Sequence, residues 1–238
     1  MPPRQRVPEG PAPEPVAQRI RVQYAKRGRM RFTSSRDFQR ALERAVRRAG
    51  LPMAFTAGFH PHPRISYANA APTGTASEAE FVELALTRPV DPQEVAGALD
   101  EALPDGLTVL RVVVAAPGAL ADRLEASRWR LDFPGLAEGA LQPVVTALLA
   151  AERVEVSRLM KQGPRLLDVR APLLAAEVSQ VGATARLEVT LRHTTPTIRP
   201  EEVWRALSLI GEVSLPRPLG TRLAQGPLLG TGVTDPLG

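Results

Sequence analysis

Five arginines recur at three- and four-residue steps in one short stretch of this sequence: Arg36, Arg40, Arg44, Arg47 and Arg48. In a helix, this spacing places side chains on a common face. Guanidinium groups are rigid, always charged and able to bind carboxylates or phosphates through two parallel hydrogen bonds. The chemistry that this pattern predicts is therefore recognition of an anion.

The charge of the surrounding segment favours the same interpretation. Residues 19–64 contain 12 Lys or Arg and 2 Asp or Glu, whereas the rest of the chain carries 18 basic and 23 acidic side chains. Residues 24–70 also hold 6 of the 10 aromatic side chains. Clustered cations with interleaved aromatic rings are typical of surfaces that bind nucleic acid. Beside the five arginines, the predicted contact residues are Lys26, Arg29, Arg31, Phe59, His60, His62 and Arg64.

A simpler alternative is a solvated helix face, in which arginine stems cover apolar surface and the charged heads lie in water. Within the helix only Asp37 and Glu43 are acidic, and only Glu43 opposes the arginines. Repulsion between like charges then costs a few tenths of a kcal/mol for each pair, about 0.2–0.5. An anionic partner would relieve that repulsion.

The sequence GFHPHPRIS follows the basic stretch. Pro61 and Pro63 push His60 and His62 into extended conformations, and Gly58 permits a tight entry, which predicts a stiff loop. Its imidazoles could act as acid and base in RNA cleavage without a metal, but two histidines are too few for a metal site. A binding or docking loop and a purely structural turn remain open. We expect the helix and the loop to enclose a cationic hollow.

Local signals define the elements that must position these residues. Ser34 or Ser35 can cap a helix that Gly50 and Pro52 end. The first half then reads β-α-β-β-α-β, the split unit of ferredoxin-like folds. Its predicted strands are residues 19–26, 52–58, 80–88 and 107–116, and its helices are residues 35–49 and 91–104.

The second half repeats this order approximately. Its predicted strands are residues 127–133, 153–160, 165–173, 185–193 and 211–215, and its helices are residues 136–152, which could begin only at Pro143, and 199–210. The predicted fold class is α+β, with two tandem ferredoxin-like halves and disordered termini. The predicted domains are a Pro-rich leader over 1–16, a basic domain over 17–117, a second domain over 118–218 and a flexible tail over 219–238.

Composition excludes several classes of protein. The 238 residues suffice for one large or two ordinary domains, and a hydrophobic fraction of 44% is ordinary for a globular chain. The absence of cysteine excludes disulfides, thiolate metal sites and an iron–sulfur cluster ligated by this chain. The sequence has no secretory signal and no apolar run of about 20 residues. We therefore expect a cytoplasmic protein without membrane contact.

The stretch from Lys26 to Glu83, and more broadly residues 20–84, resembles the radical-SAM-linked protein family, a domain of unknown function found fused to or beside cobalamin-binding radical SAM proteins. The family's characteristic positions fall on Lys26, Gly28, Arg31, Phe32, Asp37, Arg40, Arg44, Arg47, Arg48, Pro52, Gly58, Phe59, Pro61, His62, Pro63, Ser66, Gly74, Ser77, Glu78 and Glu80. One position departs from the family: Ser35 stands where it usually has histidine. That departure favours binding over catalysis.

The resemblance implies a non-catalytic accessory protein of a radical SAM system. This chain would hold no cofactor, and a radical SAM partner would supply the iron–sulfur cluster and SAM. We expect the basic helix and the HPHP loop to hold RNA, such as tRNA or rRNA, for modification. A docking module for the radical SAM partner without nucleic acid, and a metal-free endoribonuclease using His60 or His62, are the alternatives.

Overall fold

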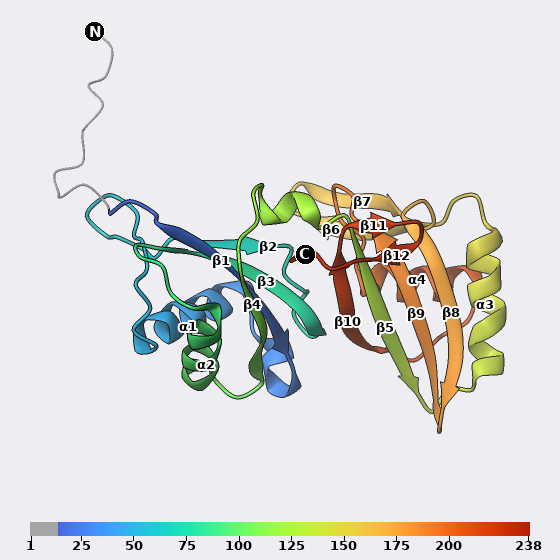
Figure 1. Cartoon of the computed structure of the whole chain (residues 1–238). Coiled ribbons are helices and arrows are strands. Elements are labelled where there is room, and N and C mark those ends of the chain that lie inside the picture. Colours follow the sequence, from blue (N-terminus) through green and yellow to red (C-terminus); the bar gives the residue numbers. More distant parts are fainter. Residues whose placement is uncertain (1–13) are drawn as a thin grey trace, which may run out of the picture. The chain divides into compact units, whose positions relative to one another are not determined.

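A computed structural model describes residues 14–238, so most of the predicted leader lies outside the described residues. The chain divides into two compact units (Figure 1). Apart from the last two residues, the first unit contains the chain up to Ala70 and Glu80–Gly118, and the second contains Ala71–Ala79 and Ala119–Pro236. The chain is an α+β protein with a mixed β-sheet and, in its described part, four α-helices.

The first unit has the predicted β-α-β-β-α-β order. Its elements are β1 (Gln18–Lys26), the 3-10 helix η1 (Gly28–Phe32), α1 (Ser35–Arg48), β2 (Ile65–Ala68), β3 (Ala76–Leu86), α2 (Pro92–Ala102) and β4 (Leu107–Val114). The strand order is β4-β1-β3, and β2 pairs antiparallel with β3. α1 and α2 lie side by side (Figure 1) and share one apolar core with β1, β3 and β4.

Helix α1 forms as its sequence predicts. Ser34 is the N-cap, and its hydroxyl accepts a hydrogen bond from the Asp37 backbone N–H at 3.2 Å. Gly50 follows the helix with φ +62°, a conformation that favours glycine. The buried side of the helix consists of Phe38, Ala41, Leu42, Ala45 and Val46. Packing of this side fixes which face of α1 points to solvent.

The second predicted strand, residues 52–58, is wrong. Within it Met53 and Phe55 make only isolated bridges, with Leu86 and Pro63, and the actual strand is β2. Prolines at 52, 61 and 63 cannot donate a backbone hydrogen bond to a ladder. The shorter run from Ile65 to Ala68 has a donor at every residue and pairs with β3 from Leu84 to Phe81.

The second unit follows a similar order with an added hairpin. Its elements are η2 (Leu120–Arg123), β5 (Ala126–Pro134), α3 (Glu138–Ala150), β6 (Glu155–Met160), β7 (Gly163–Asp168), β8 (Leu173–Val181), β9 (Thr184–Arg192), α4 (Pro200–Ile210), β10 (Leu219–Gly226), β11 (Leu228–Leu229) and β12 (Gly232–Val233). Strands β10-β5-β9-β8 pair antiparallel, and the first residues of β3 pair parallel with β10. β6 and β7 form a separate hairpin.

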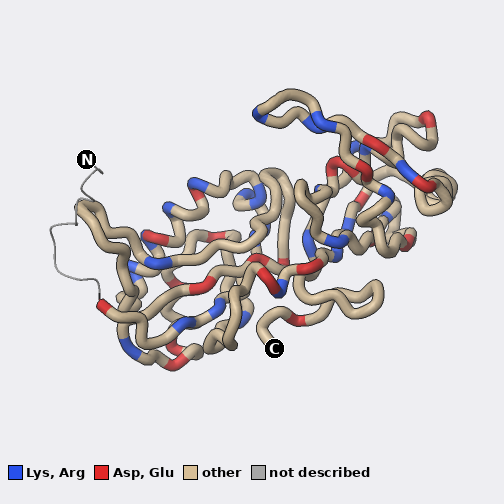
Figure 2. Tube along the Cα trace, turned by 90° about the horizontal axis from the view of Figure 1, so that it is seen from above, with Lys and Arg blue, Asp and Glu red and all other residues tan. Residues whose placement is uncertain are grey.

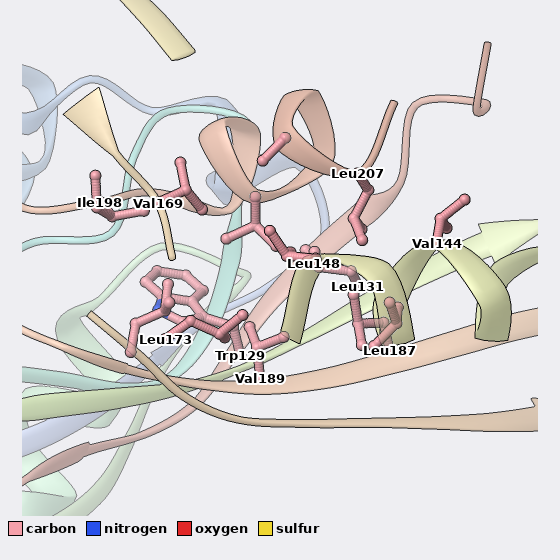
Figure 3. Packing of buried hydrophobic residues seen from close by; sticks show 14 of the residues in the cluster. Trp129, Leu131, Val144, Leu148, Val169, Leu173, Leu187, Val189, Ile198 and Leu207 are labelled. Atoms are coloured by element: carbon pink, nitrogen blue, oxygen red, sulfur yellow. The ribbon is translucent and has the colours of Figure 1, made fainter. Parts of the chain in front are cut away.

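The core of the second unit lies between its strands and its helices (Figure 3). Trp129 and Leu131 of β5 meet Leu187 and Val189 of β9, and α3 and α4 add the side chains of Val144, Leu148 and Leu207. Burial of a side chain of this size stabilises a fold by roughly 1.5–3 kcal/mol.

Two predictions for the second half are wrong: the closing strand over 211–215 and the flexible tail over 219–238. Residues 211–215 form no strand, and β8 was not predicted. The predicted helix over 136–152 is confirmed as α3, which begins at Glu138 and continues through Pro143. The predicted flexible tail contains β10, the closing strand of the unit. Gly226 in this segment marks close packing, because a Cβ on it would lie 2.0 Å from the Thr234 carbonyl oxygen.

Candidate functional site

The solvent side of α1 carries an exposed row of arginines, which we name the arginine face: Arg36, Arg40, Arg44, Arg47 and Arg48. Among the described residues, none of the five forms an ion pair, and only Arg48 has a hydrogen-bond partner, the Ala102 carbonyl at 3.3 Å. This cluster of guanidinium groups is therefore uncompensated within residues 14–238.

The two carboxylates of α1 point to other partners. Asp37 accepts a hydrogen bond from the Ser34 hydroxyl at 2.7 Å and belongs to the cap of the helix. Glu43 is half-buried beside Tyr67. Burial raises the pKa of the Tyr67 hydroxyl above its ordinary value, and the Glu43 charge raises it further. Neither acid neutralises the arginine face.

The chain before α1 brings some of the predicted cations to the surface. Arg29 is exposed and Arg31 is half-buried, with its guanidinium 4.9 Å from the centre of the Phe32 ring. Lys26 differs, because only 5% of it is exposed at the end of β1. Its burial withdraws Lys26 from the predicted binding surface.

The HPHP loop is closed by hydrogen bonds at its base. The Thr56 N–H donates to the His62 carbonyl at 2.9 Å, and the His62 N–H donates to the Thr56 hydroxyl at 3.0 Å. Gly58, with φ +120°, lets the chain turn inside this ring. Phe59, His60, His62 and Arg64 are all exposed. The loop is therefore stiff at its base and presents its side chains outward.

The predicted cations are spread along the length of the first unit, and the hollow expected between α1 and the HPHP loop stays a prediction. η1 comes directly after β1, and the Arg27 N–H bonds to Gly106 at the start of β4. The HPHP loop instead follows the C-terminal end of α1. Before the loop, the Ala54 N–H donates to the Ala85 carbonyl near the end of β3. The Ala17 N–H, just before β1, donates to the neighbouring Leu86 carbonyl. α1 separates the two groups by its length, about 21 Å for 14 residues. The cations of η1, α1 and the HPHP loop follow one another in that order along the chain, and we call this series the strip.

The geometry gives no support to catalysis by the HPHP loop. Neither the His60 nor the His62 imidazole has a hydrogen-bond partner within residues 14–238, whereas an acid or base is normally oriented by one. The same residues contain no cluster of three or more His, Cys, Asp or Glu side chains that could hold a metal ion. No helix in this part of the chain is long and apolar enough to span a membrane.

Sequence reasoning missed a serine–histidine pair in the second unit. The His193 Nδ1 lies 2.6 Å from the Leu124 carbonyl, which can only accept, so Nδ1 carries the proton and Nε2 accepts from the Ser127 hydroxyl at 2.7 Å. Burial lowers the pKa of His193; the Leu124 hydrogen bond opposes this effect and the Arg222 charge adds to it. Ser127 is 0% exposed. The pair links the residue that follows β9 to β5 and to the Leu124 carbonyl inside the second unit.

Fold and site together define an α+β protein with an uncompensated cationic helix. The chain belongs to the family described as "Uncharacterized protein conserved in bacteria (DUF2344)", whose model matches residues 19–200. That description contains no reference to radical SAM proteins. No curated protein matches this sequence.

One solved structure similar to this chain is the "Crystal Structure of an Unknown Protein from Galdieria sulphuraria". It shares 15% sequence identity, the match covers 82% of this chain and 92% of that chain, and the TM-score is 0.23.

Proposed function

We propose that this chain is a cytoplasmic, non-catalytic accessory protein that binds RNA along α1 and the HPHP loop and presents it to a radical SAM enzyme for modification. The arginine face is the observation on which the proposal rests. Five exposed guanidinium groups on one helix face, unpaired within the described residues, repel one another until an anion binds. A phosphate backbone supplies anions at repeated intervals, which suits an elongated strip better than a compact pocket.

The radical SAM part of the proposal is supported by the sequence resemblance over residues 20–84. A chain without cysteine cannot ligate an iron–sulfur cluster through thiolates, so the cluster and SAM belong to the partner. tRNA and rRNA are the RNA classes that we propose as substrates. The departure at Ser35 leaves a binding role intact and removes a side chain that could do chemistry.

We also infer that both units are ferredoxin-like. The strand order β4-β1-β3-β2 of the first unit and the order β10-β5-β9-β8 of the second correspond element by element once the β6–β7 hairpin is set aside. In each unit one helix follows the first strand and another precedes the last. This correspondence supports a tandem arrangement of one β-α-β-β-α-β plan.

Retention of RNA by the full chain on filters tests the proposed function. Wild type should retain tRNA or rRNA fragments at low salt, and retention should fall with a log–log salt slope of about −0.7 for each phosphate contacted in a single strand. Arg40→Glu with Arg44→Glu should abolish retention.

A matched control reverses the same number of charges elsewhere. Arg153→Glu with Arg217→Glu changes two exposed arginines of the second unit and should retain RNA like wild type. RNA incubated with wild type in EDTA should remain intact. Absence of retention by wild type at low salt would overturn the proposal, and cleavage that His62→Ala removes would favour the endoribonuclease.

Docking to a protein partner without RNA is favoured by a different observation. Leu159 and Leu166 lie on the same side of the β6–β7 hairpin and are 82% and 62% exposed. Co-purification with a co-expressed radical SAM partner should survive nuclease treatment in either case. Loss of that complex in Leu159→Ala with Leu166→Ala, with no RNA retained by wild type, would favour docking over RNA binding.

A further inference from the structure

The first unit leaves two phenylalanine rings largely in solvent. Phe59 is 80% exposed and Phe32 is 62% exposed, whereas Phe38, Phe81 and Phe133 are buried. Removing such a ring from water is favourable, so its exposure in a folded protein is a cost unless another molecule covers it. Both rings flank the arginine face in the sequence, which singles them out from exposed aliphatic residues elsewhere.

The two rings lie at opposite ends of α1. Phe32 is the last residue of η1, three residues before α1 begins, and the Arg31 guanidinium lies 4.9 Å from its ring centre. Phe59 lies in the HPHP loop, which follows the C-terminal end of α1 and is closed by the Thr56 and His62 hydrogen bonds. The arginine face extends over about 21 Å between these ends.

We propose that the RNA held by this surface is single-stranded, with unpaired bases stacked on Phe32 and Phe59 and the intervening phosphates on the arginine face. This inference rests on the proposed function and specifies its substrate class. In a duplex, both faces of each base are covered by neighbouring bases, whereas an unpaired base can place one face on an aromatic ring. At the stacked spacing of 3.4 Å per nucleotide, the strip accommodates roughly six nucleotides.

The geometry also defines the expected specificity. Every base has an aromatic face, so stacking discriminates weakly among sequences. Arg31 beside the Phe32 ring adds a cation that can interact with the ring and with a nearby phosphate. The surface should therefore prefer unpaired over paired RNA and show little preference among base sequences.

Fluorescence anisotropy with an oligonucleotide of about twelve nucleotides, alone and annealed to its complement, tests this inference. Wild type should bind the single strand at least about tenfold more tightly than the duplex. Phe32→Ala with Phe59→Ala should weaken single-strand binding by about tenfold or more for each ring and leave duplex binding unchanged. Phe59→Trp should retain binding, and its fluorescence should be quenched by the single strand.

The second unit provides a matched control. Leu159→Ala with Leu166→Ala removes two side chains of similar exposure and should leave single-strand binding at the wild-type value. Equal affinity for single strand and duplex, or normal single-strand binding by the double phenylalanine variant, would overturn this inference alone. Failure of wild type to bind either RNA would instead overturn the proposed function.

Discussion

Helices α1 and α3 each follow the first strand of their unit, yet their solvent sides differ in chemistry. α1 exposes five arginines, whereas α3, with the sequence EGALQPVVTALLA, contains no basic residue. Both helices bury apolar side chains against their own core. The fold therefore requires the apolar stripe at this position and does not require the charge, which makes the arginine face of α1 a feature to explain by binding.

Several arginines of the second unit stabilise the fold through buried or half-buried hydrogen bonds and ion pairs. Arg158 donates from Nε to Glu202 at 2.9 Å and also bonds to the Thr197 carbonyl at 2.9 Å, and Arg186 donates to Asp132 at 2.7 Å. Figure 2 marks the basic and acidic positions along the trace. Within the first unit, Arg19 and Arg21 are paired in the same way with Glu83. Paired arginines hold elements together, and within residues 14–238 α1 adds to that set only the Arg48 hydrogen bond to the Ala102 carbonyl.

The largest expected effect comes from breaking the buried pair of the second unit. Glu202 is 4% exposed, binds Arg158 and accepts from the Arg199 N–H at 2.7 Å, which caps α4. Glu202→Ala should lower the free energy of unfolding by about 3 kcal/mol, because the largely buried Arg158 guanidinium would lose its carboxylate partner and keep only the Thr197 carbonyl.

Urea unfolding measures this loss. Glu201→Ala is the matched control: its carboxylate lies 3.7 Å from Arg217 at the surface, and its removal should cost about 1 kcal/mol or less. Equal losses in the two variants would mean that the second unit does not depend on its buried pair.

An intermediate effect should follow acidification, and it should arise in the second unit. Burial lowers the pKa of His193 below its ordinary value of 6.5, so the unfolded chain binds a proton that the folded chain does not. The stability from neutral His193 is fully present above pH 6.5 and is lost as pH falls from 6.5 towards the lower folded pKa. Each unit of pKa difference corresponds to about 1.4 kcal/mol.

Melting temperatures between about pH 7.5 and about pH 5.5 check the sign of this effect. Wild type should lose more thermal stability than His193→Asn, whereas the exposed-site variant His62→Asn should follow wild type. A wild-type melting temperature that rises on acidification would contradict the burial of His193 in its neutral form.

The smallest effect is expected for neutralising the arginine face. Arg40→Gln with Arg44→Gln removes like-charge repulsion at i,i+4 spacing and breaks no ion pair within the described residues. The free energy of unfolding should therefore rise by only about 0.2–0.5 kcal/mol. Thermal unfolding at low salt measures it. A loss comparable to that of Glu202→Ala would show that these arginines are structural.

Sequence reasoning succeeded where short-range signals suffice. The Ser34 cap, Gly50 and the periodic apolar residues define α1, and the same pattern predicts that Arg40 and Arg44 face solvent. Asp91 likewise caps α2 by accepting from the Gln93 N–H at 2.9 Å. These features depend on residues only a few positions apart, so they can be recognised in a single sequence.

Sequence reasoning failed where contacts between distant segments determine the structure. β2 is defined by its pairing with β3, and an apolar run next to proline resembled a strand more closely. The placement of Phe32 and Phe59 at opposite ends of α1 depends on the direction of the helix relative to β1 and β3, which spacing alone does not specify. Ser127 and His193 are 66 positions apart and meet only through the pairing of β5 with β9.

Strand β10 has a consequence for biosynthesis. It lies between β5 and the first residues of β3, so β5 lacks its second neighbour until residue 226 has been translated. During synthesis an edge of β5 stays open while more than half of the polypeptide is already outside the ribosome, and an open edge is a template for wrong pairing between nascent chains. The sheet of the second unit therefore cannot close at β5 before the polypeptide has been made through β10.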